Sequence, residues 1–479
     1  MTQFAFYDLE TFGTAAGRDR IAQFAVQRVD AGLQALGPAQ MEFCQPPAWP
    51  LPEPGACLVT GITPQQAEAR GLPEWRFCEA LLEALAGPDT CIVGYNSSRF
   101  DDTFVQHLCW RNFHDPYAWH WQQGNSRWDL LGLVRAAFAL RPEGIEWPTH
   151  PTGEPSLKLE DLARVNGLPQ PKAHDALGDV TATIALARLL REKQPRLFDY
   201  ALSLRSKQTV RALIQPGQPL VHVSGKVAAR QRCLTLWLPV CEHPSNRNEW
   251  LGLDLRGPVA PWFELEPEEL AERIYTPQED LPEECERPRL KGVAINRAPF
   301  LADLRTLPAE VAQRAELPLE DTLAKAEVLR GQLDLLAEQL LAVQAQRPDF
   351  PERDVEASLY DGFVPEGDRR RCESVRAAPL EDLGAYSGSF ADPRLEELLF
   401  RFRARHAPDT LSLIEAEEWK RLSRTHLEFA PAGGLSMEAY MQEIQARAQQ
   451  ASEADKAVLR ELWRWGQQQA AVFGLEAPL

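Results

Sequence analysis

A short apolar and aromatic run opens the chain, and two carboxylates follow it with one residue between them. Residues 4–7 (FAFY) have the composition of a buried strand. Because residues i and i+2 of a strand point to the same face, we expect Asp8 and Glu10 on one side of a sheet. Two like charges so close are costly unless a cation neutralises them, and Mg²⁺ prefers oxygen ligands of this type. Such pairs are more often ordinary solvated charges, so a metal site needs partners from elsewhere in the chain.

Strand-like and helix-like patterns alternate up to about residue 190, which indicates an α/β domain. The expected strands are residues 21–29, 40–44 and 90–94. The expected helices are residues 65–70, 75–85, 102–114, 128–140, 156–166 and 180–192.

The pattern changes twice after this domain. Residues 216–258 hold short β-rich runs broken by Pro, Gly and Asn, as in a small barrel. Residues 317–346 form one long amphipathic helix or a pair, and residues 348–351 suggest a boundary. Helical periodicity then covers residues 394–406, 412–425 and 437–473.

Two further segments supply partners for the first carboxylate pair. Asp101 follows the buried strand 90–94 and opens a helix; Asp102 is a rival, but the spacing Asn96-x-x-x-Phe-Asp favours Asp101. Asp179 lies in the first turns of a clear helical run, and His174 precedes it in a loop. A lone histidine is more often structural, but here it completes a set with the carboxylates.

Composition describes a globular protein with more than one domain. The 479 residues exceed one ordinary domain, and 44% are hydrophobic and 25% charged. We find neither a membrane-spanning stretch nor a secretory signal, so we expect a cytoplasmic protein that does not bind membranes. The nine cysteines form no Cys-x-x-Cys pair and are expected to be reduced thiols.

The net charge of −18 does not exclude a nucleic-acid partner, because global charge does not locate local charge. Between residues 201 and 247 the only acid is Glu242, against seven basic residues: Arg205, Lys207, Arg211, Lys226, Arg230, Arg232 and Arg247. Either this is a chance cluster on a solvated face, or it is a basic strip that confines a polyanion to one groove.

Together the motifs Asp8-x-Glu10, Asn96-x-x-x-Phe100-Asp101 and His174-x-x-x-x-Asp179 resemble those of the DEDD exonuclease superfamily. The histidine marks its DEDDh branch, because the tyrosine branch would have Tyr at position 175, where this chain has Asp175. The resemblance implies four metal-binding carboxylates, Asp8, Glu10, Asp101 and Asp179, that hold two Mg²⁺ ions, for which Mn²⁺ is an alternative. It also implies that His174 takes the proton from the attacking water.

Much of the chain also resembles the bacterial exonuclease I family. The matching segments cover all but the C-terminal quarter: FYDLETFG, GYNSSRFDD, NFHDPYAWHWQ, NSRWDLL, ALRPEGIEWP, AHDALGDV, QPRLFDY, PLVHVSGK and HPSNRN. The resemblance implies an RNase H-like exonuclease domain of α/β class with a mixed sheet (residues 1–194), an SH3-like β-barrel domain (195–347) and an all-α C-terminal domain (351–479). It implies a monomer and a processive 3′–5′ exonuclease that degrades single-stranded DNA to 5′-mononucleotides in DNA repair and recombination.

The same resemblance suggests which residues contact DNA. Stacking rings and basic or polar groups are expected at Glu10, Tyr117, Trp121, Arg135, Lys158, Lys207, Asn248 and Lys291. Trp119 is a further ring of this loop, and each ring is as compatible with core packing as with stacking. At position 106 the chain has Gln106, where a well-known member of the family has arginine.

The family also binds the acidic C-terminal tail of single-stranded DNA-binding protein. Arg141 and Tyr200 match that pocket, whereas Gln218 and Asp303 depart from the residues expected there. Two alternatives remain open: a 3′–5′ ribonuclease of the same superfamily, and a DNA clamp whose nuclease site has decayed.

Overall fold

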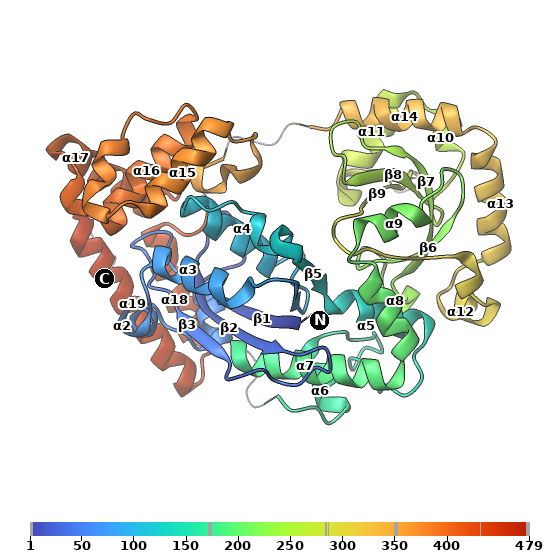
Figure 1. Cartoon of the computed structure of the whole chain (residues 1–479), viewed down its shortest axis with the longest axis horizontal. Coiled ribbons are helices and arrows are strands. Elements are labelled where there is room, and N and C mark those ends of the chain that lie inside the picture. Colours follow the sequence, from blue (N-terminus) through green and yellow to red (C-terminus); the bar gives the residue numbers. More distant parts are fainter. Residues whose placement is uncertain are drawn as a thin grey trace. The chain divides into compact units, whose positions relative to one another are not determined.

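The chain folds into two compact units in the computed structural model, which describes residues 3–170, 175–282, 285, 287–348, 353–431 and 433–475. The first unit comprises Met1–Asn125, Pro171–Thr181 and Glu352–Leu479, and the second comprises Ser126–Gln170 and Ala182–Pro351. Figure 1 shows that the first unit contains both ends of the chain, coloured blue and red. The N-terminal and C-terminal segments therefore share one folded body.

The sheet of the first unit has the order β3-β2-β1-β4. Its strands are β1 (Gln3–Thr11), β2 (Ile21–Val29), β3 (Gln40–Phe43) and β4 (Thr90–Gly94). β1 pairs antiparallel with β2 and parallel with β4, so the sheet is mixed. The ladder with β4 covers only Gln3 to Phe6, whereas the ladder with β2 continues to Thr11, so the C-terminal end of β1 is held along its β2 edge.

Helices cover this sheet and bury its apolar face. They are α1 (Pro54–Thr60), α2 (Pro64–Arg70), α3 (Glu74–Leu85), α4 (Asp101–Arg111) and the first residues of α7 (Ala176–Lys193). Phe24 of β2 packs against Phe77 of α3 with ring centroids 5.1 Å apart, and Phe104 of α4 belongs to the same buried cluster. The core thus forms between β1, β2 and the helices that carry these rings.

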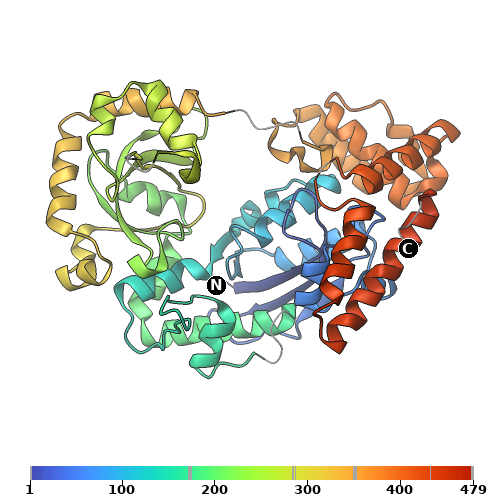
Figure 2. The ribbon, with the colours of Figure 1, turned by 180° about the vertical axis from the view of Figure 1, so that it is seen from behind.

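The C-terminal segment adds five α-helices to the first unit. They are α15 (Glu366–Ala377), α16 (Pro393–His406), α17 (Leu413–Phe429), α18 (Met437–Ala448) and α19 (Glu453–Phe473). Tyr440 and Trp465 pack with Cys57 and Ile62 in one buried cluster, and Leu395 packs with Trp110 in another. Figure 2 shows α19 in red beside the blue segment that it covers.

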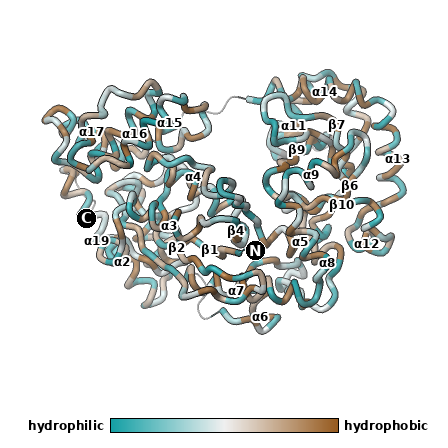
Figure 3. Tube along the Cα trace, in the orientation of Figure 1, coloured by the Kyte–Doolittle hydropathy of each residue, from teal (hydrophilic) through white to brown (hydrophobic). Residues whose placement is uncertain are grey.

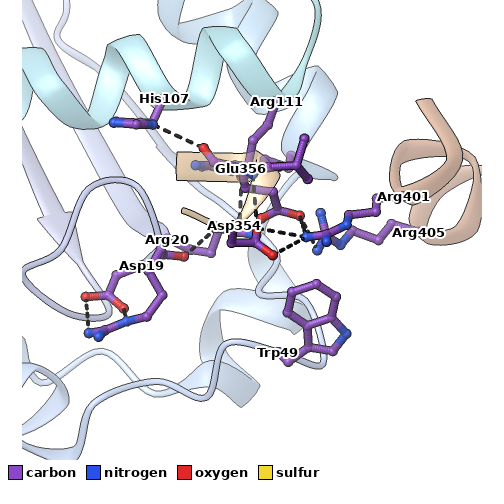
Figure 4. A network of polar contacts seen from close by, with 12 residues as sticks. Asp19, Arg20, Trp49, His107, Arg111, Asp354, Glu356, Arg401 and Arg405 are labelled. Atoms are coloured by element: carbon purple, nitrogen blue, oxygen red, sulfur yellow. Dashed lines mark hydrogen bonds and ion pairs between the residues drawn. The ribbon is translucent and has the colours of Figure 1, made fainter. Parts of the chain in front are cut away.

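A buried cluster of ion pairs also joins the C-terminal segment to the α/β part (Figure 4). Glu356, which is 3% exposed, pairs with Arg20 and lies 2.6 Å from Arg405 and 3.6 Å from Arg401. Burial by itself raises the pKa of the Glu356 carboxyl, but the arginines outweigh it and hold this pKa well below its usual range. The carboxylate is therefore charged at neutral pH and is matched by cations from both segments.

Glu74 at the start of α3 extends the cluster. It accepts hydrogen bonds from the Arg111 guanidinium, the shorter at 2.7 Å, and lies 3.5 Å from Arg20. Burial raises the pKa of its carboxyl, yet Arg111 and Arg20 bring this pKa down to about 2. Arg20 thereby bridges two buried glutamates from different segments.

The second unit contains a five-stranded antiparallel sheet of order β10-β6-β7-β8-β9. Its strands are β6 (Leu220–Val223), β7 (Leu234–Glu242), β8 (Glu249–Asp254), β9 (Leu290–Ala294) and β10 (Phe300–Ala302). Its helices include α5 (Leu130–Leu140), α6 (Leu159–Val165), α8 (Pro195–Ser203), α9 (Lys207–Leu213), α10 (Pro261–Glu264), α11 (Pro267–Tyr275), α12 (Ala309–Arg314), α13 (Leu319–Arg330) and α14 (Leu333–Ala345). Trp237 of β7 is completely buried in the core of this sheet.

Hydrophilic and hydrophobic residues are mixed along the helices of both units, as Figure 3 shows. Within the described ranges, no helix has the length and apolar composition needed to cross a membrane.

Most predicted elements of the first 300 residues are confirmed, with errors at the ends of several helices: the predicted helix 102–114 ends at Arg111, and the predicted helix 156–166 begins only at Leu159. The strand 21–29 is found as predicted, and the helix 75–85 begins one residue earlier. The predicted helix 128–140 is wrong at its start, because residues 128 and 129 belong to the strand β5 (Ser126–Asp129). The Asp129 side chain accepts a 3.0 Å hydrogen bond from the backbone N–H of Leu131, which fixes the helix start at Leu130.

The C-terminal predictions are also largely confirmed. The segment 317–346 is a pair of helices, α13 and α14, and the segment 437–473 divides into α18 and α19. Helix α1 was not anticipated, because it directly follows a proline-rich loop. Most of the predicted boundary at 348–351 lies outside the described part of the chain, which leaves out residues 349–352.

Replacing Glu356 by Gln should lower the free energy of unfolding by about 3–5 kcal/mol, because the change leaves buried arginines without their counter-charge. Urea unfolding of the full chain measures this effect. Glu397→Gln is the matched control, because Glu397 also pairs with an arginine of the cluster, Arg401, but is 41% exposed. That variant should lose at most about 1 kcal/mol.

The same pair of variants can be compared as the pH falls. A carboxylate with a lowered folded-state pKa stabilises the fold above its unfolded pKa and loses this contribution on acidification. The free energy of unfolding of the wild type should therefore decrease as the pH is lowered past the ordinary glutamate pKa of 4.5. In Glu356→Gln the same decrease should be less steep. Equal losses in the two variants, with equal acid sensitivity, would contradict a stabilising role for the buried cluster.

Candidate metal centre

Strand β1 carries Asp8 and Glu10 on one face, as predicted. In the antiparallel ladder Asp8 lies opposite Ala25 and Glu10 lies opposite Gln23. The register shifts directly after Glu10, between Glu10 and Thr11. Such irregularities are common beside active sites, where they direct a side chain away from regular pairing.

Helix α7 brings a third carboxylate to this face. Asp179 lies in its first turn, and ligand oxygens of Asp8, Glu10 and Asp179 all lie within 4.8 Å of one another. Glu10 is 7% exposed, whereas the other two are partly exposed. The sequence motifs at positions 8, 10 and 179 therefore meet in space.

Asp101, the fourth predicted carboxylate, lies beside this group. It is the first residue of α4, is 4% exposed, and accepts a 3.2 Å hydrogen bond from the backbone N–H of Leu9. Leu9 separates the two carboxylates of β1, so the bond holds α4 against that strand. The rival Asp102 instead accepts a hydrogen bond from the hydroxyl of Tyr7.

The charges of the group repel one another. Burial raises the pKa of Asp8 well above its usual range, and the charges of Asp101, Glu10, Asp179 and Asp175 raise it further. A set of carboxylates this close together is stabilised by a hard divalent cation, for which carboxylate oxygens are the preferred ligands. The donor set therefore fits Mg²⁺ or Mn²⁺.

Two further observations concern the sequence positions directly before α7. His174, the predicted general base, lies outside the described residues. Asp175 was not predicted to be part of the site, yet its charge acts on Asp8. Asp175 directly precedes α7, and its backbone carbonyl accepts a 3.1 Å hydrogen bond from the backbone N–H of Asp179, so the first turn of the helix keeps it beside that carboxylate.

The aromatic loop after α4 separates into core and surface residues. Trp119 is 4% exposed and donates a 3.0 Å hydrogen bond from Nε1 to the carbonyl of Pro116. Tyr117 is 38% exposed and Trp121 is 58% exposed. Trp119 is therefore core, whereas Tyr117 and Trp121 remain available for stacking.

Other predicted DNA contacts lie in the second unit. The ammonium of Lys207 donates a 2.8 Å hydrogen bond to Oδ1 of Asn248, so these two residues form an exposed pair. Lys158 is 66% exposed and lies 3.8 Å from Glu160, whereas Lys291 is only 6% exposed. Arg135 packs so close to Gly225 that a Cβ there would lie 2.7 Å from the guanidinium carbon.

The basic stretch 201–247 is partly neutralised within its own unit. Arg211 forms an ion pair with Glu242, the only acid of the stretch. At position 106, where the chain departs from the arginine of a well-known family member, Gln106 is buried and accepts a 2.7 Å hydrogen bond from the hydroxyl of Tyr360.

The residues predicted to bind the acidic tail also lie in the second unit. The hydroxyl of Tyr200 donates a 2.7 Å hydrogen bond to the carbonyl of Leu301. Burial raises the pKa of Tyr200, and the charge of Asp303 raises it further. Arg141 directly follows α5, which packs against α8 that carries Tyr200. Asp303 thus places a negative charge near Tyr200, although its carboxylate pairs with Arg305 at 2.9 Å.

Comparisons with known proteins cover almost the whole chain. Family models match in three segments: the exonuclease model at residues 5–187, the exonuclease I SH3-like domain at residues 205–346 and the exonuclease I C-terminal domain at residues 353–469. The chain is 42% identical to Exodeoxyribonuclease I of Escherichia coli over 97% of this chain and 98% of that protein.

Solved structures agree with the sequence comparison. The crystal structure of E. coli exonuclease I in complex with a dA16 oligonucleotide is 40% identical, with a TM-score of 0.92, and covers 98% of this chain and 100% of that one. The zinc-bound E. coli complex with single-stranded DNA matches with the same identity, TM-score and coverage. The predicted fold class, with its exonuclease, SH3-like and helical C-terminal parts, is confirmed.

Replacing Asp8 by Asn should stabilise the metal-free protein, because it removes a charge that its neighbours repel. In EDTA we expect a gain of about 1 kcal/mol, or roughly 2–4 °C in the melting temperature of a unit of this size. Adding Mg²⁺ should raise the melting temperature of the wild type and raise that of the variant less. Glu79→Gln is the control, because it removes a carboxylate that is 42% exposed. It should have the wild-type melting temperature in EDTA and the full wild-type response to Mg²⁺. No response of the wild type to Mg²⁺, combined with no gain in Asp8→Asn, would contradict a cation site.

Proposed function

The chain belongs to the exonuclease I family, and on this premise we propose that it degrades single-stranded DNA processively from the 3′ end, releasing 5′-mononucleotides. The observation that carries the proposal is the convergence of Asp8, Glu10 and Asp179, with Asp101 beside them, in a chain that matches E. coli exonuclease I bound to single-stranded DNA.

The proposed reaction is hydrolysis of the terminal phosphodiester bond. The oxygen of a water molecule attacks phosphorus, and the bond from phosphorus to the 3′-oxygen of the preceding nucleotide breaks. The carboxylates of Asp8, Glu10, Asp101 and Asp179 would hold two divalent ions, Mg²⁺ with Mn²⁺ as an alternative. When bound, such ions lower the pKa of water and neutralise charge that develops on the phosphate and leaving oxygens.

The chain supplies the groups that move the proton and hold the substrate. We assign His174 as the base that accepts the proton of the attacking water, because an imidazole with an ordinary pKa near 6.5 suits this role at neutral pH. Tyr117 and Trp121 offer exposed rings to unpaired bases. Stacking contributes about 1–3 kcal/mol per base and does not depend on sequence.

The remaining DNA contacts belong to the same proposal. We propose that Glu10 contacts the DNA at the metal centre. We also propose that phosphates and sugars are held by Arg135, Lys158, Lys291 and the hydrogen-bonded pair Lys207 and Asn248. We also propose domain boundaries at residues 1–194, 195–347 and 351–479, a cytoplasmic monomer, and a role in DNA repair and recombination.

His174→Ala should retain affinity for single-stranded DNA but reduce turnover by about 10²–10⁴-fold, because it removes a proton acceptor and leaves the carboxylates and rings in place. Steady-state kinetics with fluorescence-anisotropy binding, in Ca²⁺ to prevent cleavage, separates the two effects. The exposed His150 provides a control in His150→Ala, which should leave both quantities unchanged. Full turnover in His174→Ala would remove the histidine from the mechanism.

We further propose that Arg141 and Tyr200 bind the acidic C-terminal tail of single-stranded DNA-binding protein. Arg141→Ala should weaken binding of a tail peptide, whereas Asp303→Asn should strengthen it, because Asp303 places a negative charge near Tyr200. Calorimetric titration measures both effects. Unchanged affinity in Arg141→Ala would argue against this site.

The choice of substrate distinguishes the proposal from its two rivals. Single-stranded DNA, RNA and duplex DNA of equal length and sequence should be degraded in that order of preference, with single-stranded DNA far ahead. Faster degradation of RNA would support a ribonuclease. Binding without degradation of any substrate would support a clamp with a decayed nuclease site.

A further inference from the structure

We propose that Tyr7 is a positioning residue that aligns the metal-binding carboxylates of β1 with that of α4. The inference rests on the function proposed above, because it assigns Asp8 and Asp101 to one metal centre.

The hydroxyl of Tyr7 connects the two elements directly. It donates a 2.5 Å hydrogen bond to Oδ1 of Asp102, and each of the two side chains is 2% exposed. Tyr7 immediately precedes Asp8 in β1, and Asp102 immediately follows Asp101 in α4. One buried hydrogen bond therefore joins the neighbours of two proposed ligands that are 93 positions apart in the sequence.

A buried bond of this kind restricts geometry strongly. Hydrogen bonds that involve a carboxylate are short and directional, and their effect is not diluted by water in the interior. A second bond, from the backbone N–H of Leu9 to Asp101, joins the same two elements. The two bonds come from Tyr7 and Leu9, which flank Asp8, and together they fix both the distance and the rotation of the first turn of α4, which a single bond would not.

The ring of Tyr7 is held in place as well. A Cβ at Gly94 would lie 3.3 Å from Cε1 of Tyr7, so glycine leaves space for the ring. On another side, Tyr7 packs edge-on against Trp119, with ring centroids 6.4 Å apart and an interplanar angle of 75°. The hydroxyl of Tyr7 thus binds the carboxylate of Asp102, and its ring supports the loop that carries Tyr117 and Trp121.

A purely structural explanation is that Asp102 stabilises the first turn of α4 by its charge at the helix N-terminus. That effect needs the carboxylate but not the hydroxyl of Tyr7. Tyr7→Phe keeps the ring, the carboxylate and the packing and removes only the hydrogen bond, so it separates the two explanations.

The test uses the full chain and Mn²⁺ as the probe. Tyr7→Phe should weaken Mn²⁺ binding, measured by calorimetry without DNA, and lower kcat on single-stranded DNA, each by about 10- to 100-fold, as is common for residues that orient metal ligands. KM should stay unchanged, because the ring still supports the aromatic loop.

Tyr440→Phe is the matched control. Tyr440 is also fully buried and donates a 3.1 Å hydrogen bond to the carbonyl of Leu462, but it lies in the C-terminal helices. It should lower the melting temperature without changing Mn²⁺ affinity or kcat. Asp102→Ala and the double variant complete a cycle, in which the double variant should be no worse than Asp102→Ala alone.

Wild-type affinity for Mn²⁺ in Tyr7→Phe, or additive losses in the cycle, would overturn the positioning role. If the wild type binds Mn²⁺ but degrades no DNA, the proposed function is at fault, and the Mn²⁺ titrations still decide the role of Tyr7.

Discussion

The repulsion among carboxylates at the end of β1 is the constraint on which the site depends. Asp8, Glu10 and Asp179 have ligand oxygens within 4.8 Å, and the charges of Asp101 and Asp175 reach the same place. Such an arrangement persists without a cation only because the scaffold holds it. The ladder with β2 holds β1 as far as Thr11, and α4 is attached to β1 through Leu9. A divalent cation removes the repulsion among these carboxylates when it binds. The repulsion therefore destabilises the metal-free state and at the same time favours binding of the metal.

The C-terminal segment contributes to this scaffold. Its helices bury apolar residues against the α/β part, and Glu356 lies among arginines from both segments. Isolated charges are rarely buried, because desolvation costs several kcal/mol per ion, as estimates for protein interiors indicate. Matching charges from two segments restrict how those segments can dock. The cluster therefore favours one specific arrangement within the first unit, beyond what apolar packing alone would select.

Local features of the fold and the site were accessible from the sequence. The alternation of a strand places Asp8 and Glu10 on one face, and helical periodicity identifies residues 394–406 closely. Features that depend on distant residues were not accessible. Nothing near Arg20 in the sequence indicates that it will meet Glu356, and only tertiary packing makes Trp119 core while Trp121 remains exposed. The hydrogen bond that Tyr7 donates to Asp102 was also not accessible from the sequence. The motif spacing favours Asp101 over Asp102 as the metal ligand, but it cannot show which residue either aspartate contacts. The family comparison adds a function that no single residue reveals.

The most direct test of the account follows digestion of a 5′-labelled single-stranded DNA oligonucleotide by the wild type and by Asp8→Ala, each in Mg²⁺ and in EDTA. The account predicts a ladder that shortens from the 3′ end only for the wild type in Mg²⁺. Digestion that persists in EDTA or in Asp8→Ala, or immediate loss of label as a mononucleotide from the 5′ end, would contradict the central claim that this carboxylate cluster uses divalent ions for 3′–5′ cleavage.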